Sequence, residues 1–152
     1  MIELGGITVT LALAIWVGAI VFQSAVVAPS VFKTLEADSA GRFLRGLFPR
    51  FFRAGLVCGF AMLAGAAVLY IAGVRDGRVT TLAAVTALMV LLQFTAGRMV
   101  PAINAARDAG EAGRKRFGQL HGINVLLTIA VLLLGIGMLA ALAMAVPLQI
   151  GV

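Results

Sequence analysis

The chain alternates between four long uncharged runs and short segments that hold nearly all of its charged residues. The runs extend from Leu4 to Phe32, from Ala54 to Val74, from Val79 to Gly97, and from Phe117 to the C-terminus. A helix of about 20 apolar residues crosses the roughly 30 Å hydrocarbon core of a bilayer, so each run is long enough for one crossing. The pattern predicts four membrane-spanning helices, at about residues 7–28, 54–74, 79–100 and 122–146.

Composition supports a membrane protein and excludes several soluble classes. Hydrophobic residues make up 62% of the 152 residues and charged residues 12%, whereas soluble domains average about 45–50% and about 25%. We therefore expect one all-α domain, residues 1–152, that forms an integral membrane four-helix bundle. A soluble enzyme, a nucleic-acid-binding protein and a disulfide-stapled secreted module are excluded. Cys58 is the single cysteine, so an internal disulfide is excluded too.

Ten of the twelve lysines and arginines lie in the segments between helices 1 and 2 and between helices 3 and 4. Four crossings place these two segments on the same side of the membrane. The positive-inside rule predicts that this side is the cytoplasm, with both termini outside a bacterial inner membrane. Four acidic residues in the same segments leave an excess of six positive charges. We expect this face to bind anionic phospholipids.

The first basic segment is itself patterned. Between residues 39 and 53, phenylalanines and leucines alternate with arginines at near-helical spacing. This pattern predicts an amphipathic helix that lies in the headgroup layer between helices 1 and 2, with a bend near Gly46 caused by Pro49. An alternative is an arginine-lined entrance for an anionic ligand, and in that case Arg50 and Arg98 are candidate contacts.

Polar residues inside the spans fall on one face of each helix. A turn of 100° per residue places Trp16, Gln23 and Ser30 on one stripe, and Phe117, His121, Asn124 and Thr128 on another. Gln93 and Asn104 share a face of helix 3 if that helix continues through Pro101. Polar side chains in a span are costly, so these faces point into the bundle. Each of these polar side chains is a candidate ligand contact, with an ordinary interhelical hydrogen bond as the alternative. The ligand-binding candidates are Trp16, Gln23, Gln93, Asn104, His121 and Asn124.

Three residues have metal-binding chemistry. Cys58 and Met62 lie one helical turn apart and offer soft sulfur ligands to Cu(I) or platinum. His121 is the one side chain in or beside a span that changes charge near neutral pH. Two sulfurs make an incomplete site, so packing is the competing interpretation for Cys58 and Met62.

Several motifs resemble one family of small membrane proteins, the family that includes transmembrane protein 205. In the first half they are Trp16-Val17-Gly18, Val27-Ala28-Pro29-Ser30-Val31-Phe32 and Leu47-Phe48-Pro49-Arg50-Phe51; in the second half they are Pro101-Ala102-Ile103-Asn104 and Phe117-Gly118-Gln119-Leu120-His121. The resemblance implies a four-helix membrane protein catalogued as a domain of unknown function. The first helix is also similar to copper-resistance D and HemJ-like membrane proteins, of which the latter hold haem through histidine.

These observations support three functional hypotheses. In the first, the protein is non-enzymatic and binds or transports a metal or an organic solute through a polar bundle interior. Because four helices enclose little volume, this hypothesis expects a homodimer. In the second, His121 takes part in haem or copper binding in a HemJ-like redox protein. In the third, the glycine faces Gly55-x-x-x-Gly59 and Gly137-x-x-x-Ala141 hold a partner membrane protein. We expect no nucleic acid partner.

Overall fold

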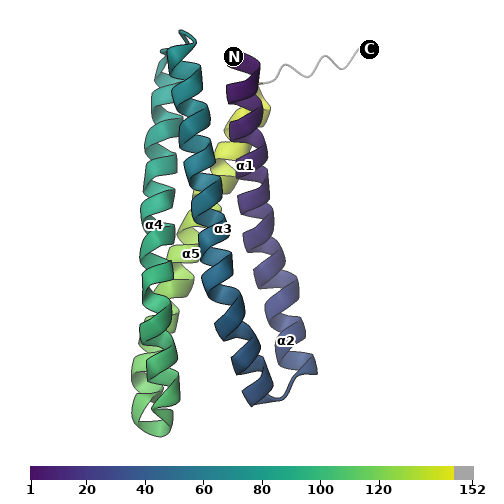
Figure 1. The fold of residues 1–152 in the computed structure, drawn as a ribbon, viewed down its shortest axis with the longest axis vertical. Coiled ribbons are helices and arrows are strands. Elements are labelled where there is room, and N and C mark those ends of the chain that lie inside the picture. Colours follow the sequence, from purple (N-terminus) through teal and green to yellow (C-terminus); the bar gives the residue numbers. More distant parts are fainter. Residues whose placement is uncertain (146–152) are drawn as a thin grey trace.

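The computed structural model describes residues 1–145 and shows an antiparallel bundle of four long helical rods (Figure 1). The first rod joins α1 (Ile2–Phe22), a π-helical turn η1 (Gln23–Val27) and α2 (Ala28–Thr34). The others are α3 (Ala37–Ile71), α4 (Gly77–Asp108), and α5 (Arg114–Ala145), which follows the 3-10 turn η2 (Gly110–Gly113). All four rods are long and apolar enough to cross a membrane. The predicted all-α membrane bundle is confirmed; Val146, at the end of the fourth expected span, lies outside the described residues.

The helices are longer than the predicted spans, mainly at the basic end. α3 has 35 residues and α4 has 32, which at 1.5 Å per residue is about 52 Å and about 48 Å. Both exceed the roughly 30 Å of a hydrocarbon core. The two basic segments are therefore largely helical extensions of the spans. They lie together at one end of the bundle, at the bottom of Figure 1.

The prediction that residues 39–53 are helical is confirmed, but the prediction that they form a separate helix is wrong. The segment is helical, but it is the first part of α3, which continues through Pro49 without a break. Two arginine side chains bond to backbone carbonyls of α3 around Pro49. Arg50 donates to the Gly46 carbonyl at 2.7 Å, and Arg53 donates to the Pro49 carbonyl at 3.2 Å. The apolar face turns inward, with Leu44 and Phe52 buried against other helices. Tertiary packing thus uses a face that the sequence assigned to the lipid surface.

A short turn joins α3 to α4 and makes them a tight hairpin. Gly73 adopts a φ of +95°, a conformation that favours glycine. The carboxylate of Asp76 then accepts a hydrogen bond from the Val79 amide at 3.0 Å and caps α4. Together these two residues reverse the chain within a few positions.

Small residues draw the helices together in the half of the bundle away from the basic end. α1 and α3 cross where Gly5 faces Gly65, and a Cβ on Gly65 would lie 3.0 Å from the Gly5 carbonyl oxygen. Gly59 leaves room for the Trp16 ring in the same way. The expected glycine face of Gly55 and Gly59 is therefore used inside the chain, whereas Gly137 faces open space. Around these contacts Leu13, Trp16, Met62, Met89 and Val131 form a continuous core.

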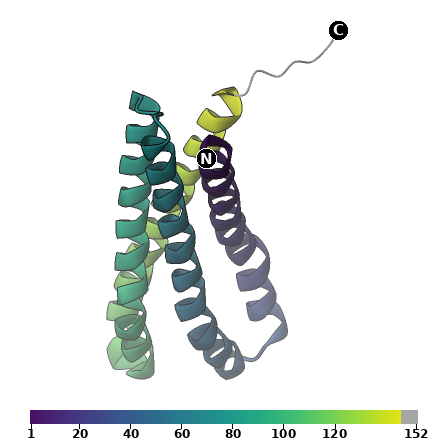
Figure 2. The ribbon, with the colours of Figure 1, turned by 45° about the horizontal axis from the view of Figure 1, so that its top comes forward.

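The rods diverge toward the basic end. α5 begins beside α4 and runs diagonally behind α3 to end near the start of α1 (Figure 2). α2 contacts α3 but is not in contact with α5 in the described residues. The bundle is closed at one half and open at the other.

The α1–α3 crossing gives a stability prediction. A Gly65→Val substitution should lower the free energy of unfolding by about 1–3 kcal/mol, because the added side chain has no room against Gly5 and Val9. The loss can be measured by titrating the detergent-solubilised protein with sodium dodecyl sulfate. Gly6→Val is the matched control, since Gly6 faces open space on α1. Equal unfolding midpoints for the two variants would contradict the proposed close crossing.

Candidate ligand-binding site

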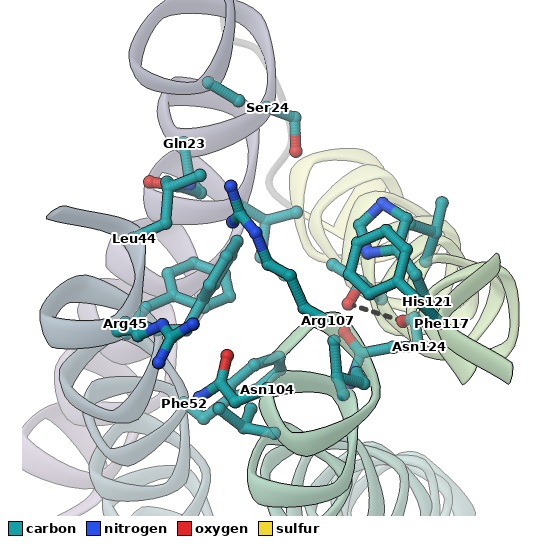
Figure 3. Close-up of a pocket in the computed structure, with 18 of the residues that line it drawn as sticks. Gln23, Ser24, Leu44, Arg45, Phe52, Asn104, Arg107, Phe117, His121 and Asn124 are labelled. Carbon is teal, nitrogen blue, oxygen red and sulfur yellow. Dashed lines mark hydrogen bonds between the residues drawn. The ribbon is translucent and has the colours of Figure 1, made fainter. Parts of the chain in front are cut away.

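A cavity of about 600 Å³ occupies the open, basic half of the bundle. This volume lies within the range of about 300–1,000 Å³ that is typical of small-molecule sites. Figure 3 looks into it and shows side chains from the first rod, α3, α4 and α5 around one space. Its lining is mostly apolar, with Ile20, Leu44, Phe48, Phe52, Val100 and Leu132 among the lining residues.

Four of the predicted ligand-binding residues line this cavity: Gln23, Asn104, His121 and Asn124. They come from three different rods and are brought together by the fold. The helical stripes from which they were predicted therefore do face one interior space. His121 stacks on Phe117 with parallel rings whose centroids are 5.5 Å apart, and both side chains border the cavity.

Asn124 is held by the neighbouring helix. Its side-chain nitrogen donates to the Ala96 carbonyl at 2.7 Å, and its backbone carbonyl accepts from the Thr128 hydroxyl of the same helix at 3.0 Å. Pro101 lacks the amide that would bond to the Gly97 carbonyl. The bond from Asn124 goes to the carbonyl one residue earlier, at Ala96. Asn124 therefore ties α5 to α4 beside the cavity.

Trp16 and Gln93 lie deeper, in the core rather than in the cavity lining. The Gln93 side chain donates to the Phe52 carbonyl at 3.4 Å, and Phe52 does line the cavity. Within the described residues, Trp16 Nε1 and Gln93 Oε1 are buried without a hydrogen-bond partner. Both side chains press against Gly55, where a Cβ would lie 2.7 Å from Trp16 Nε1. This small polar cluster therefore adjoins Phe52, which separates it from the cavity.

The π-helical turn explains a departure from the predicted stripe on the first helix. Trp16 and Gln23 are buried, as the stripe requires, but Ser30 is exposed and Val31 is buried instead. A π turn contains one more residue than an α turn, so it shifts every later position by one. Val31 therefore packs against Ala40 and Leu44 of α3, in the place predicted for Ser30.

Two of the predicted arginines lie outside the cavity, and two others line it. Arg50 and Arg98 are exposed and absent from its lining, whereas Arg45 and Arg107 project into it (Figure 3). The sequence contains a spacing pattern that could have identified Arg45. Gly41, Arg45, Phe48 and Phe52 recur at intervals of four and three residues, which marks one helix face. That face becomes evident only when residues 39–53 are treated as part of the second span.

Cys58 and Met62 belong to the core. Met62 is fully buried and Cys58 packs against the same cluster. Neither lines the cavity that His121 borders. In the part of the chain that the structure describes, no group of three or more histidine, cysteine or acidic side chains is arranged to hold a metal. The contacts observed for the two sulfur residues are packing contacts.

The fold and the cavity together define a class: a polytopic membrane protein whose four-helix bundle encloses a largely apolar cavity at its basic end. Residues 11–112, more than half of the chain, match the family described as a domain of unknown function (DUF4149), and the chain belongs to this family. No curated protein and no solved structure gives a significant match. The matched segment ends before α5, so the wall that carries His121 and Asn124 lies beyond it.

The two asparagines at the cavity give a prediction that separates structural from ligand-facing groups. Asn124→Leu should lower the free energy of unfolding by about 0.6–2 kcal/mol, because it removes the bond to Ala96. Asn104→Leu should change it by less than about 0.5 kcal/mol, since Asn104 makes no side-chain hydrogen bond within residues 1–145. Titration with sodium dodecyl sulfate measures both. Equal losses would show that the Ala96 bond has no special role.

Proposed function

We propose that this protein binds a small organic ligand in the cavity at its basic end, without carrying out catalysis. The observation that carries the proposal is the cavity of about 600 Å³ with its mostly apolar lining and few polar groups, among them Gln23, Asn104 and His121. Ligand sites commonly combine these features. The residues come from separate helices, so the site depends on the folded bundle.

Binding with exchange at one end fits the packing better than an open path through the bundle. The core of Leu13, Trp16, Met62 and Met89 closes the half of the bundle beyond the cavity. A ligand in the cavity thus meets a packed layer on one side. The cavity is also complete within a single chain, so binding needs no second copy, although a homodimer remains an expectation.

The residues that line the cavity also bear on the alternative hypothesis of haem binding. Among the described residues that line the cavity there is no carboxylate, cysteine or methionine. A haem held by His121 and a methionine of the same chain, as in the redox hypothesis, thus gains no support from the lining. The kinship with the family that includes transmembrane protein 205 is likewise a proposal. It rests on the sequence motifs from Trp16 to Asn104 alone.

Blocking the cavity tests the proposal. Ser24 and Ala25 are both exposed residues of η1, but Ser24 lines the cavity and Ala25 does not. In native mass spectrometry of protein incubated with a bacterial lipid extract and a panel of organic solutes, the unmodified chain should retain a bound molecule. Ser24→Phe should weaken that binding about tenfold or more, equivalent to about 1.4 kcal/mol. Ala25→Phe should leave it unchanged.

Two results would contradict the proposed ligand site. One is that the unmodified chain retains no molecule from the extract or the panel. The other is that Ser24→Phe and Ala25→Phe reduce retention equally, because a general effect on the helix would then explain both. Circular dichroism of each variant establishes that the helices are intact.

We also propose that the basic end faces the cytoplasm and contacts its anionic leaflet, on the strength of the positive-inside rule. The native chain has a single cysteine, so a Cys58→Ser background gives clean labelling. In intact cells a membrane-impermeant maleimide should label Arg75→Cys, at the α3–α4 turn. It should label Ala109→Cys, at the basic end, only after permeabilisation. The reverse pattern would invert the proposed orientation.

A further inference from the structure

The polar end of the cavity continues into a second, smaller recess. This recess has a volume of about 220 Å³ and is lined by Asp38, Gly41, Arg42, Arg45 and Arg107. Gly41, Arg45 and Arg107 line both spaces. Arginine side chains therefore stand at the boundary between a mainly apolar cavity and a charged recess.

Arg107 lies at this boundary with most of its hydrogen-bonding capacity unused. Its guanidinium rests on Gly41, where a Cβ would lie 2.9 Å from one terminal nitrogen. Within the described residues its one hydrogen bond is to the Ala37 carbonyl, at 3.4 Å, and it takes part in no ion pair. A guanidinium has five N–H donors, so several remain for a ligand.

The other two arginines add positive charge beside it. Arg45 is paired with Asp108, with one contact at 3.1 Å, but both side chains are substantially exposed. Exposed ion pairs contribute little stability, so an incoming anion competes readily with Asp108. Arg42 donates to the Ser39 hydroxyl at 2.9 Å. Three guanidinium groups thus surround a recess whose nearby acidic groups are Asp38 and Asp108.

The apolar cavity also opens sideways. Phe32 on α2 and Ile129 on α5 both line it, yet Phe32 is 64% exposed and Ile129 is 43% exposed. In the described residues no Cα atom of α2 lies within 8 Å of a Cα atom of α5, so the two helix backbones stand apart beside these exposed side chains. Ile129 lies near the middle of α5 and thus at the depth of the hydrocarbon core. A chain dissolved in the bilayer can therefore enter between these helices.

We propose that the ligand is a single-chain acidic lipid. Its phosphate pairs with Arg107 and its arginine neighbours, and its hydrocarbon chain lies in the apolar cavity. Guanidinium groups bind such anions through paired N–H···O bonds. This inference rests on the proposed function, since it names the class of ligand that the same cavity holds.

Three probes separate the head group from the chain. Oleoyl lysophosphatidic acid carries an acidic head and one chain, oleoyl lysophosphatidylcholine has the same chain with a zwitterionic head, and glycerol 3-phosphate has no chain. The protein in dodecylmaltoside should bind the first about tenfold or more tightly than the second, because charge-assisted hydrogen bonds are strong. Glycerol 3-phosphate should bind much more weakly than the lysophosphatidic acid.

Variants locate the site. Arg107→Gln should weaken binding of lysophosphatidic acid about tenfold or more and leave lysophosphatidylcholine unchanged. Arg107→Lys should restore part of the loss, because it keeps the charge but not the planar fork. Arg53→Gln is the matched control: Arg53 is exposed, bonds a carbonyl of its own helix and lines neither cavity nor recess. Unfolding curves for each variant verify that the bundle is intact.

The outcomes distinguish this inference from the proposed function. Equal affinity for the two lysolipids, with both blocked by Ser24→Phe, would overturn the acidic head group and keep the cavity as a ligand site. Equal losses for Arg53→Gln and Arg107→Gln would also overturn it, because general attraction to the basic end would then explain binding. Glycerol 3-phosphate as tight as the lysophosphatidic acid would overturn the role of the chain. Absence of binding by every lysolipid overturns the acidic-lipid proposal alone, while retention by the cavity of another solute that Ser24→Phe blocks keeps the proposed function.

Discussion

Backbone hydrogen bonding in a medium without water is the constraint on which the rest of this structure depends. In hydrocarbon each unsatisfied amide or carbonyl costs several kcal/mol, so the spans must be continuous helices. Pro29, Pro49 and Pro101 each remove one helical donor, and each lies in a different rod at the open half of the bundle. Other departures from regular helix bonding lie near these prolines. A π turn precedes Pro29, Arg50 donates to the Gly46 carbonyl beside Pro49, and Asn124 donates to the Ala96 carbonyl one turn before Pro101.

The contrast between the two halves of the bundle follows from residue size. At the closed half, Gly5, Gly59 and Gly65 let helix backbones and the Trp16 ring approach closely. At the basic half, Phe48, Phe51 and Phe52 line the cavity, and Gly97 brings only α4 close to α3, by leaving room for Phe52. The cavity lies where α2 and α5 make no such close approach in the described residues. The arginines at its polar end lie where the helices leave the hydrocarbon, so their charges remain hydrated on one side.

Much of the architecture was predictable because hydropathy and length are local properties. The uncharged runs place the four spans, and the polar stripes correctly place Gln23, Asn104, His121 and Asn124 around one interior space. The course of residues 39–53 was not predictable in this way, since an amphipathic helix has the same pattern on a lipid surface as against other helices. The roles of Arg45 and Arg107 depend on that choice. Ser30 was misplaced for another reason: a constant 100° per residue assumes an unbroken α-helix, and no residue type marks a π turn unambiguously.

The π turn has a consequence for how this chain tolerates changes in length. One extra residue in a turn rotates everything beyond it by about 100° relative to a regular helix. Removing a single residue from Gln23–Val27 would return the first rod to ordinary α geometry and turn α2 about its own axis by that amount. Val31 would then leave its contacts with Ala40 and Leu44, and Phe32 would leave the side opening of the cavity. A one-residue deletion at this place alters the shape of the cavity while every residue that lines it outside the turn stays the same.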